Sequence, residues 1–189
     1  MKKMMMLVMM TMMVAIAAQA KDAKVTVTSG SGQVMQEADK TATLVIDYSN
    51  TKVEGEPLKQ NLQKRGDEFV RDWPKLEEAS KKTFVETFNK RNKKGLQIVE
   101  EGDADYKIKF IVDKLDFGNT GAAVVFGGFG SAGGAEVTGT IVVTDKGGKE
   151  VVKYDIHEVR GGGTTDFTEG KRMASCYINV VKMTLKASK

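Results

Sequence analysis

Four segments of the chain alternate between apolar and polar residues, and this pattern limits the possible folds more than any other feature. They are residues 42–48, 106–113, 137–144 and 152–157. Alternation with a period of two residues is typical of β-strands that bury one side. Because the other side of each segment is largely polar, we expect a mostly antiparallel sheet that is covered on one face only. Residues 25–28 and 97–100 are weaker candidates for strands.

Two further segments have the periodicity of amphipathic helices and could cover the apolar face of that sheet. We expect the first to begin near residues 72–74 and to end at Gly95, because Asp and Pro are favoured where a helix begins and Gly where it ends. We expect the second to begin near Asp166, with Glu169 three residues later as in a capping box. The apolar stripes of the two helices are Leu76, Ala79, Phe84 and Phe88, and Met173, Cys176, Tyr177, Val180 and Thr184.

The order of these elements is strand, helix, four strands and helix. It predicts an α+β fold, a two-layer sandwich in which a mostly antiparallel sheet of about five strands carries two helices packed on one face. We expect residues 41–189 to form a single domain, preceded by an amino-terminal extension or edge strand at residues 21–40.

Residues 1–20 have the pattern of an export signal. Lys2 and Lys3 precede an apolar run from Met4 to Ile16, and Ala18-Gln19-Ala20 is a typical cleavage site. A retained membrane anchor is the alternative, but the run is shorter than the roughly 20 apolar residues that span a bilayer. We therefore expect cleavage after Ala20 and a periplasmic or secreted protein without a transmembrane segment.

The composition excludes several classes of site. The chain has one cysteine and one histidine, so we expect no disulfide framework, no His/Cys zinc site and no cofactor. A basic run at residues 90–94 could bind nucleic acid or anionic lipid. A cationic helix end is the simpler interpretation, because lysines complement the negative pole of the helix dipole. We therefore expect no nucleic acid partner.

The sequence contains no catalytic motif with the structural context that the motif requires. Residues 128–133 match the dinucleotide motif G-x-G-x-x-G, but a strand-like segment follows them where the motif requires a helix. His157 and Cys176 are expected on opposite layers, so they should not form a base and nucleophile pair. The acidic cluster at residues 100–105 is interpreted as a solvated turn, with calcium binding as the alternative. We expect a protein that is not an enzyme.

The least ordinary segment is the glycine-rich stretch from Gly118 to Gly134, which has no charged residue. It could continue the sheet as a long hairpin, close over a ligand as a flexible lid, or become ordered on a partner.

A family resemblance joins these features. Ala104-Asp105-Tyr106 enters a long strand, Phe126-Gly127-Gly128-Phe129-Gly130 forms the loop, and residues 136–145 form a second strand before a final amphipathic helix. In element order the chain resembles small exported Gram-negative domains of unknown function, the amino-terminal domain of TolB and the periplasmic domain of the curli-secretion protein CsgG. The resemblance implies a fold and an envelope location. It transfers no catalytic residues, and it does not imply translocation or secretion.

The resulting hypothesis is a non-catalytic module that binds an envelope protein or another envelope component. The alternative is a small-ligand receptor in which residues 118–134 form a lid. The candidate binding residues come from the glycine-rich stretch and from the polar face of the sheet: Phe126, Gly128, Phe129, Gly130, Lys107, Lys109, Thr138, Thr140 and His157.

Overall fold

The computed structural model describes residues 23–118, 133–161 and 168–189. Eight strands of these residues form one sheet, in which the central order is β1-β8-β7-β6-β2-β5 and the short β3 pairs with β4 and β6. The strands are β1 (Lys24–Gly30), β2 (Thr41–Asp47), β3 (Lys52–Val53), β4 (Glu56–Pro57), β5 (Gln97–Val99), β6 (Tyr106–Asp116), β7 (Glu136–Asp145) and β8 (Glu150–Arg160). The helices are the 3-10 helix η1 (Gly32–Gln36) and the α-helices α2 (Leu58–Arg65), α3 (Asp67–Arg91) and α5 (Glu169–Ala187).

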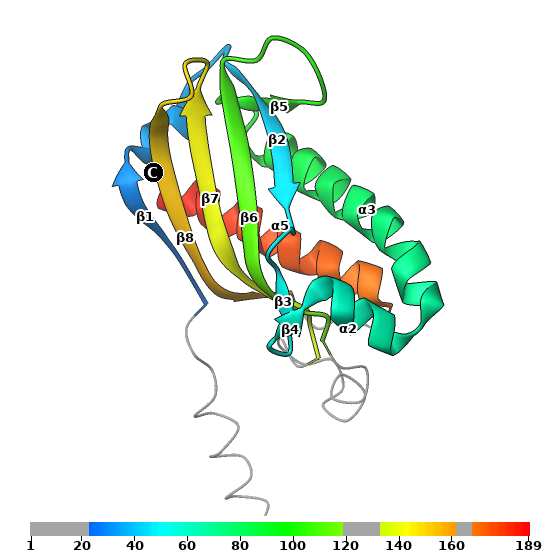
Figure 1. Ribbon diagram of the computed structural model, residues 1–189. Helices are drawn as coiled ribbons and strands as arrows, with labels where there is room; N and C mark the ends of the chain where they lie inside the picture. The colour runs from blue at the N-terminus through cyan, green and yellow to red at the C-terminus, as the bar shows by residue number, and fades with distance from the viewer. Residues whose placement is uncertain (1–22, 119–132, 162–167) are drawn as a thin grey trace, which may run out of the picture.

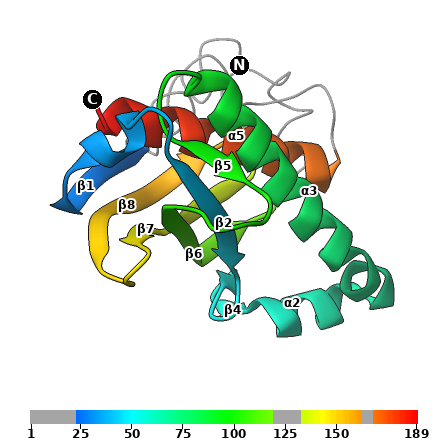
Figure 2. The same ribbon diagram turned by 90° about the horizontal axis from the view of Figure 1, so that it is seen from above.

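Helices α3 and α5 lie on one face of the sheet, and the main core lies between these two layers (Figures 1 and 2). From α3, Phe84 and Phe88 face the sheet because residues four apart share one side of a helix. From α5, the largest side chain in the core is that of Tyr177, and its ring contacts Phe110 of β6 edge-on at 5.8 Å between centroids. All four aromatic side chains have at most 1% of their surface exposed.

The predicted fold class is wrong. Among the described residues the structure has eight strands in one mixed sheet and three α-helices, in place of about five mostly antiparallel strands and two helices. Strands β3 and β4 have two residues each, which is too few to show any alternation. Helix α2 buries only three side chains, and one of them is the polar Asn61, so its apolar stripe is too weak to find in the sequence.

The mixed character of the sheet arises mainly from β2, and the short β3 is also parallel to β6. Strand β2 is parallel to both of its neighbours, β5 and β6. Helices α2 and α3 lie between β2 and these strands in the chain, and a long connection of this kind lets two neighbouring strands run in the same direction. Alternation within a strand indicates its faces but not the direction of its neighbour, so the sequence pattern could not predict this pairing.

The predicted starts of the helices also differ from the structure. Helix α3 begins at Asp67, before the expected residues 72–74, and Pro74 lies inside it. Pro74 removes one backbone donor. The carbonyl left without that donor belongs to Val70, whose side chain is 43% exposed, so water can reach this turn. Helix α5 begins at Glu169, which is thus its first residue and not the third residue of a capping box; the glutamate pairs with Arg65 of α2. Asp166 lies outside the described residues.

Most of the glycine-rich stretch also lies outside the described residues. The three interpretations of residues 118–134 therefore remain predictions, and the structure says nothing of Phe126, Gly128, Phe129 and Gly130. In the part of the chain that is described, no helix has the length and apolar character needed to cross a bilayer.

Candidate functional site

The face of the sheet opposite α3 and α5 is the candidate site, and we call it the open face. Five candidate residues from the sequence lie on it, because their neighbours in the strands point into the core. Ile108 and Phe110 of β6, Ile141 of β7 and Ile156 of β8 are almost fully buried. The structure thus brings together, on three neighbouring strands, Lys107, Lys109, Thr138, Thr140 and His157.

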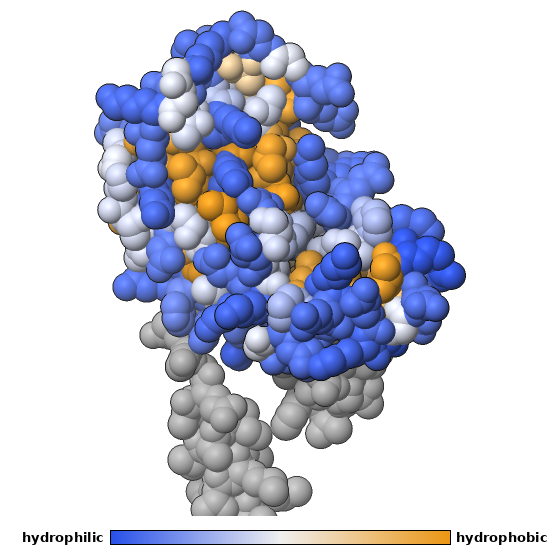
Figure 3. All heavy atoms as spheres, in the orientation of Figure 1, coloured by the Kyte–Doolittle hydropathy of each residue, from blue (hydrophilic) through white to orange (hydrophobic). Residues whose placement is uncertain are grey.

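Apolar side chains occupy the middle of the open face, between polar ones. The register pairs Val45 of β2 with Lys109, and Lys109 with Val142 of β7. In the next row, Ile111 of β6 pairs with Thr140. Val45 is 40% exposed, and Ile111 and Val142 are half-buried. The space-filling view shows patches of apolar surface in this central region, with polar side chains among them and around them (Figure 3).

The residues of this apolar centre are not among the binding residues predicted from the sequence. Ile111 and Val142 lie at positions where the alternation requires an outward side chain, between Lys109 and Asp113 in β6 and between Thr140 and Thr144 in β7. An apolar residue at an outward position was therefore the signal that could have identified them.

An ion pair lies beside this apolar centre. The ammonium group of Lys109 is 2.8 Å from a carboxylate oxygen of Asp47, at the end of β2. The pKa of Asp47 lies well below its usual range, chiefly because its carboxylate accepts a hydrogen bond from Lys109. The Ser49 backbone N–H, which donates to the same carboxylate at 2.9 Å, lowers the pKa further. Asp47 is therefore a carboxylate at neutral pH, and it fixes the position of the Lys109 side chain on the open face.

A bulge ends the open face near the carboxyl end of β8. The register between β7 and β8 shifts between Val137 and Gly139. Glu158 has a φ of 47° and donates its backbone N–H to the Thr138 hydroxyl at 3.1 Å. Thr138 thus has a structural partner in the bulge, whereas His157 is exposed and pairs in register with Lys24 of β1.

His157 and Cys176 do not form a catalytic pair. Cys176 is fully buried in α5, and its thiol donates to the Val159 carbonyl at 3.1 Å. Burial raises the pKa of this thiol to about 12, so the thiolate that a nucleophile requires is not formed near neutral pH. His157 lies on the exposed side of the sheet.

The acidic cluster is divided among separate partners. Asp105 accepts the Thr41 backbone N–H and the Lys40 ammonium group, both at 3.0 Å. Asp103 pairs with Lys146 at 2.8 Å. Within the described residues, no three His, Cys, Asp or Glu side chains are placed to hold a metal ion. Asp103 and Asp105 thus connect this turn to neighbouring parts of the sheet.

A separate hollow of about 480 Å³ lies beside the point where the glycine-rich stretch begins. Its apolar lining includes Phe69, Leu76 and Phe117, and its charged lining includes Glu169 and Arg172. The Arg172 side chain is only 5% exposed and donates to the Phe117 carbonyl at 2.8 Å. This contact fixes Phe117 against α5.

Comparisons with known proteins identify no family. No family model matches the chain, and no curated protein matches it. Among solved structures, the PelC dodecamer from Paraburkholderia phytofirmans is 16% identical, with a TM-score of 0.47 over 88% of this chain and 99% of that chain. A leucine-to-methionine variant of PelC from the same organism is 17% identical, with a TM-score of 0.46 and the same coverage.

A crystal structure of an uncharacterized protein is 9% identical, with a TM-score of 0.41 over 80% of this chain and 94% of that chain. Similarity at these levels does not transfer the assembly or the function of PelC to this chain. It neither confirms nor refutes the resemblance to TolB and CsgG.

Proposed function

We propose that this protein is a non-catalytic binding module of the cell envelope, and that it binds another envelope protein through the open face. The observation that carries the proposal is the apolar centre formed by Val45, Ile111 and Val142 on a face that neither α3 nor α5 covers. The signal-like residues 1–20 support an envelope location after cleavage at Ala20.

The chemistry of the open face fits a protein partner. Protein interfaces combine a central apolar patch with a polar, hydrated rim. On the open face the rim carries charges of both signs, with Lys107 at one end and Asp155, which pairs in register with Thr140, nearer the other. An exposed sheet face with apolar groups near its centre and charges of both signs around them therefore favours another folded protein as the partner.

The test is a pair of valine substitutions. Val142 lies in the apolar centre of the open face, whereas Val70 is 43% exposed on α3, away from that face. Both positions would be changed to lysine in tagged protein, and complexes in intact cells would be fixed by formaldehyde before purification. Val142→Lys should remove the cross-linked species seen with wild type, and Val70→Lys should retain it. Retention by both variants, or no cross-linked species in wild type, would contradict the proposal.

A small-ligand receptor is the second candidate, and the hollow beside Phe117 favours it. Its volume of about 480 Å³ lies in the range of small-molecule sites. Its lining combines four apolar residues with four charged ones, namely Leu62, Phe69, Leu76 and Phe117, and Glu68, Asp72, Glu169 and Arg172. Residues 118–134 remain a proposed lid.

A thermal-unfolding screen of residues 21–189 against metabolites, glycans, nucleotides and divalent metals tests this alternative. A ligand at a hundred times its dissociation constant adds roughly 2.7 kcal/mol, which raises the unfolding midpoint by roughly 5 to 11 °C. A ligand of the hollow should lose this effect in Leu76→Glu and retain it in Val70→Glu. A screen without any shift would count against the receptor.

A further inference from the structure

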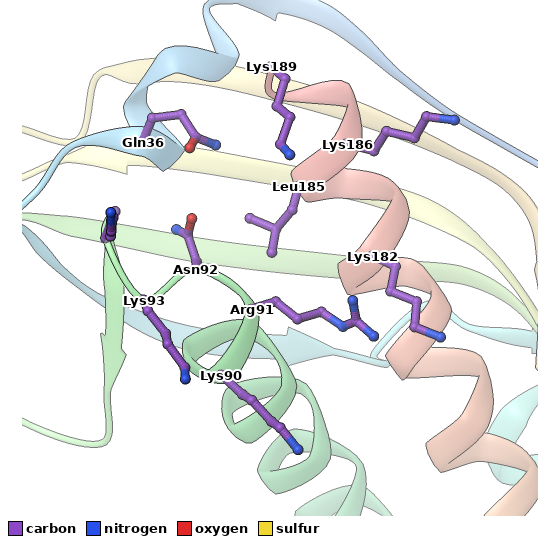
Figure 4. A pocket seen from close by; sticks show the side chains of 11 residues that line it. Gln36, Lys90, Arg91, Asn92, Lys93, Lys182, Leu185, Lys186 and Lys189 are labelled. Carbon is purple, nitrogen blue, oxygen red and sulfur yellow. The ribbon is translucent and has the colours of Figure 1, made fainter.

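The carboxyl ends of α3 and α5 meet around a hollow of about 390 Å³ that we call the cationic basin (Figure 4). From α3 and the turn after it come Lys90, Arg91, Lys93 and Lys94. From α5 and the residues after it come Lys182, Lys186 and Lys189. Seven of the eleven residues that line the basin are basic and none is acidic. None of the seven has an ion pair with the described residues.

Hydrogen bonds of Asn92 fix the end of α3 and the turn after it, which together carry four of these basic residues. The Asn92 side-chain amide donates to the Met35 carbonyl at 2.6 Å and to the Leu96 carbonyl at 3.0 Å. These bonds tie the end of α3 to η1. A side chain at Gly95 would lie 2.6 Å from the Met35 carbonyl oxygen, so only glycine fits there. The turn that carries Lys93 and Lys94 is thus fixed.

Helix α5 forms the opposite side. Lys182 and Lys186 are four residues apart in α5 and share one side of this helix, and Lys189 follows its end. In Figure 4, Arg91 extends from α3 toward α5, and Lys189 points into the gap above Leu185. Leu185 is the floor and is 8% exposed.

Helix ends alone do not explain this concentration of charge. The dipole of a helix favours cations within its last turn, which accounts for Lys90 and Arg91 in α3 and for Lys186 in α5. Lys93, Lys94 and Lys189 follow those turns, and Lys182 precedes one. No acidic side chain lines the basin, so no carboxylate among its lining residues offsets the repulsion between these like charges. The basin therefore costs stability in the free protein, and an anionic ligand would offset that cost.

We propose that the cationic basin binds a linear anionic polysaccharide. Six of its seven basic residues are lysines, which act as flexible point charges and do not impose the planar geometry of arginine. Such a set fits a chain with repeated negative groups better than one anion held in a fixed orientation. The affinity should therefore rise with the number of charged units on the chain.

Two other polyanionic partners fit less well. Single-stranded nucleic acid stacks its bases on aromatic side chains, and no aromatic residue is among those that line the basin. A bilayer surface binds amphipathic elements that insert apolar side chains. Here the apolar lining is Leu185, which is buried, and the surface is concave.

The experiment measures binding of alginate, a linear polymer with one carboxylate per sugar, to residues 21–189. Alginate fragments of two, four and eight sugars would be titrated without divalent metals, with neutral dextran as the uncharged control. The eight-sugar fragment should bind at least about tenfold more tightly than the two-sugar fragment. Its affinity should fall by at least about tenfold between 50 and 200 mM salt, because binding releases counterions.

A charge-matched pair of variants locates the site. One variant carries Arg91→Glu, Lys182→Glu and Lys186→Glu in the basin. The other carries Lys59→Glu, Lys81→Glu and Lys149→Glu, three exposed lysines outside the basin. The net charge changes equally in both, so only the basin variant should lose alginate binding. Val142→Lys on the open face should retain it, which separates this inference from the proposed function.

Several results would contradict binding of an anionic polysaccharide in the cationic basin. Equal binding of dextran, equal loss in both charge variants, or no binding of the eight-sugar fragment would overturn the proposal. Tighter binding of a twenty-residue poly-dT strand would make nucleic acid the ligand, and tighter binding of phosphatidylglycerol vesicles would make it a membrane surface; either result also overturns it.

Discussion

Asn92 shows how one buried side chain determines the end of an element. Its backbone N–H bonds to the Phe88 carbonyl at 2.8 Å and ends α3, while its side chain bonds to Met35 and Leu96. In the sequence this asparagine stands within the basic run at residues 90–94, and nothing beside it marks it as a buried residue. The run suggested a helix end, but the contact with η1 joins residues 57 positions apart, and no local pattern reports it.

We predict that Asn92→Ala destabilises the protein by about 1 to 2 kcal/mol, because two buried hydrogen bonds are lost. The Met35 carbonyl keeps the Leu96 N–H and the Leu96 carbonyl keeps the Gln97 side chain as donors. The free energy of unfolding in urea measures this change. Asn50 lies in an exposed turn, so Asn50→Ala is the matched control and should change stability by less than about 0.5 kcal/mol. Equal effects of the two substitutions would contradict the role of Asn92.

Asp47 gives a pH-dependent prediction. Its pKa is lower in the folded protein than in the unfolded chain, chiefly through the hydrogen bond from Lys109. The stability that the carboxylate contributes is therefore fully present above its unfolded pKa of about 3.9 and decreases as the pH falls toward the folded value. The stability difference between wild type and Asp47→Asn should be constant from pH 6 to 8 and should shrink below about pH 4.

Urea unfolding of both proteins from pH 2.5 to 8 measures this dependence. In a Lys109→Met background the same comparison should change less with pH, because the main cause of the lowered pKa is gone. A difference between wild type and Asp47→Asn that stays constant below pH 4 would be inconsistent with the ion pair.

Among the elements, strong periodicity predicted the long strands, but it did not predict the short elements beside them or the direction in which the strands pair. The predicted segments at 42–48, 106–113, 137–144 and 152–157 overlap β2, β6, β7 and β8. The two-residue strands β3 and β4, the helix α2 and the parallel pairing of β2 were not predicted. Short elements bury too few side chains to impose a pattern, and strand direction depends on contacts distant in sequence.

Helix α3 should depend on its two buried phenylalanines. Phe88 is 1% exposed and stacks on Phe84 at 6.4 Å between ring centroids. Phe88→Ala should destabilise the protein by about 3 to 5 kcal/mol, since it removes a buried ring and leaves a cavity. Val70→Ala on the exposed side of the same helix should cost less than about 0.5 kcal/mol. Chemical denaturation compares them, and a small effect at Phe88 would contradict the packing described for α3.

At the scale of the whole molecule, two surfaces of different chemistry lie on different parts of the fold. The open face has an apolar centre, and the cationic basin is lined by seven basic residues and no acidic one. Alternation alone predicted that Lys107, Lys109 and His157 would share a face. The basin joins residues 90–94 with residues 182–189, and only the packing of α3 against α5 brings them together.

Site-directed photo-cross-linking in intact cells can show whether the open face contacts a protein partner. A photoreactive amino acid would replace Lys107 or His157 on the open face, and Lys59 or Lys82 on helices α2 and α3 as controls; all four are exposed. If the open face is the contact surface, as we propose, both open-face positions should give one common cross-linked species and the helix positions should give none. Cross-links from Lys59 or Lys82 with none from Lys107 and His157 would contradict this proposal.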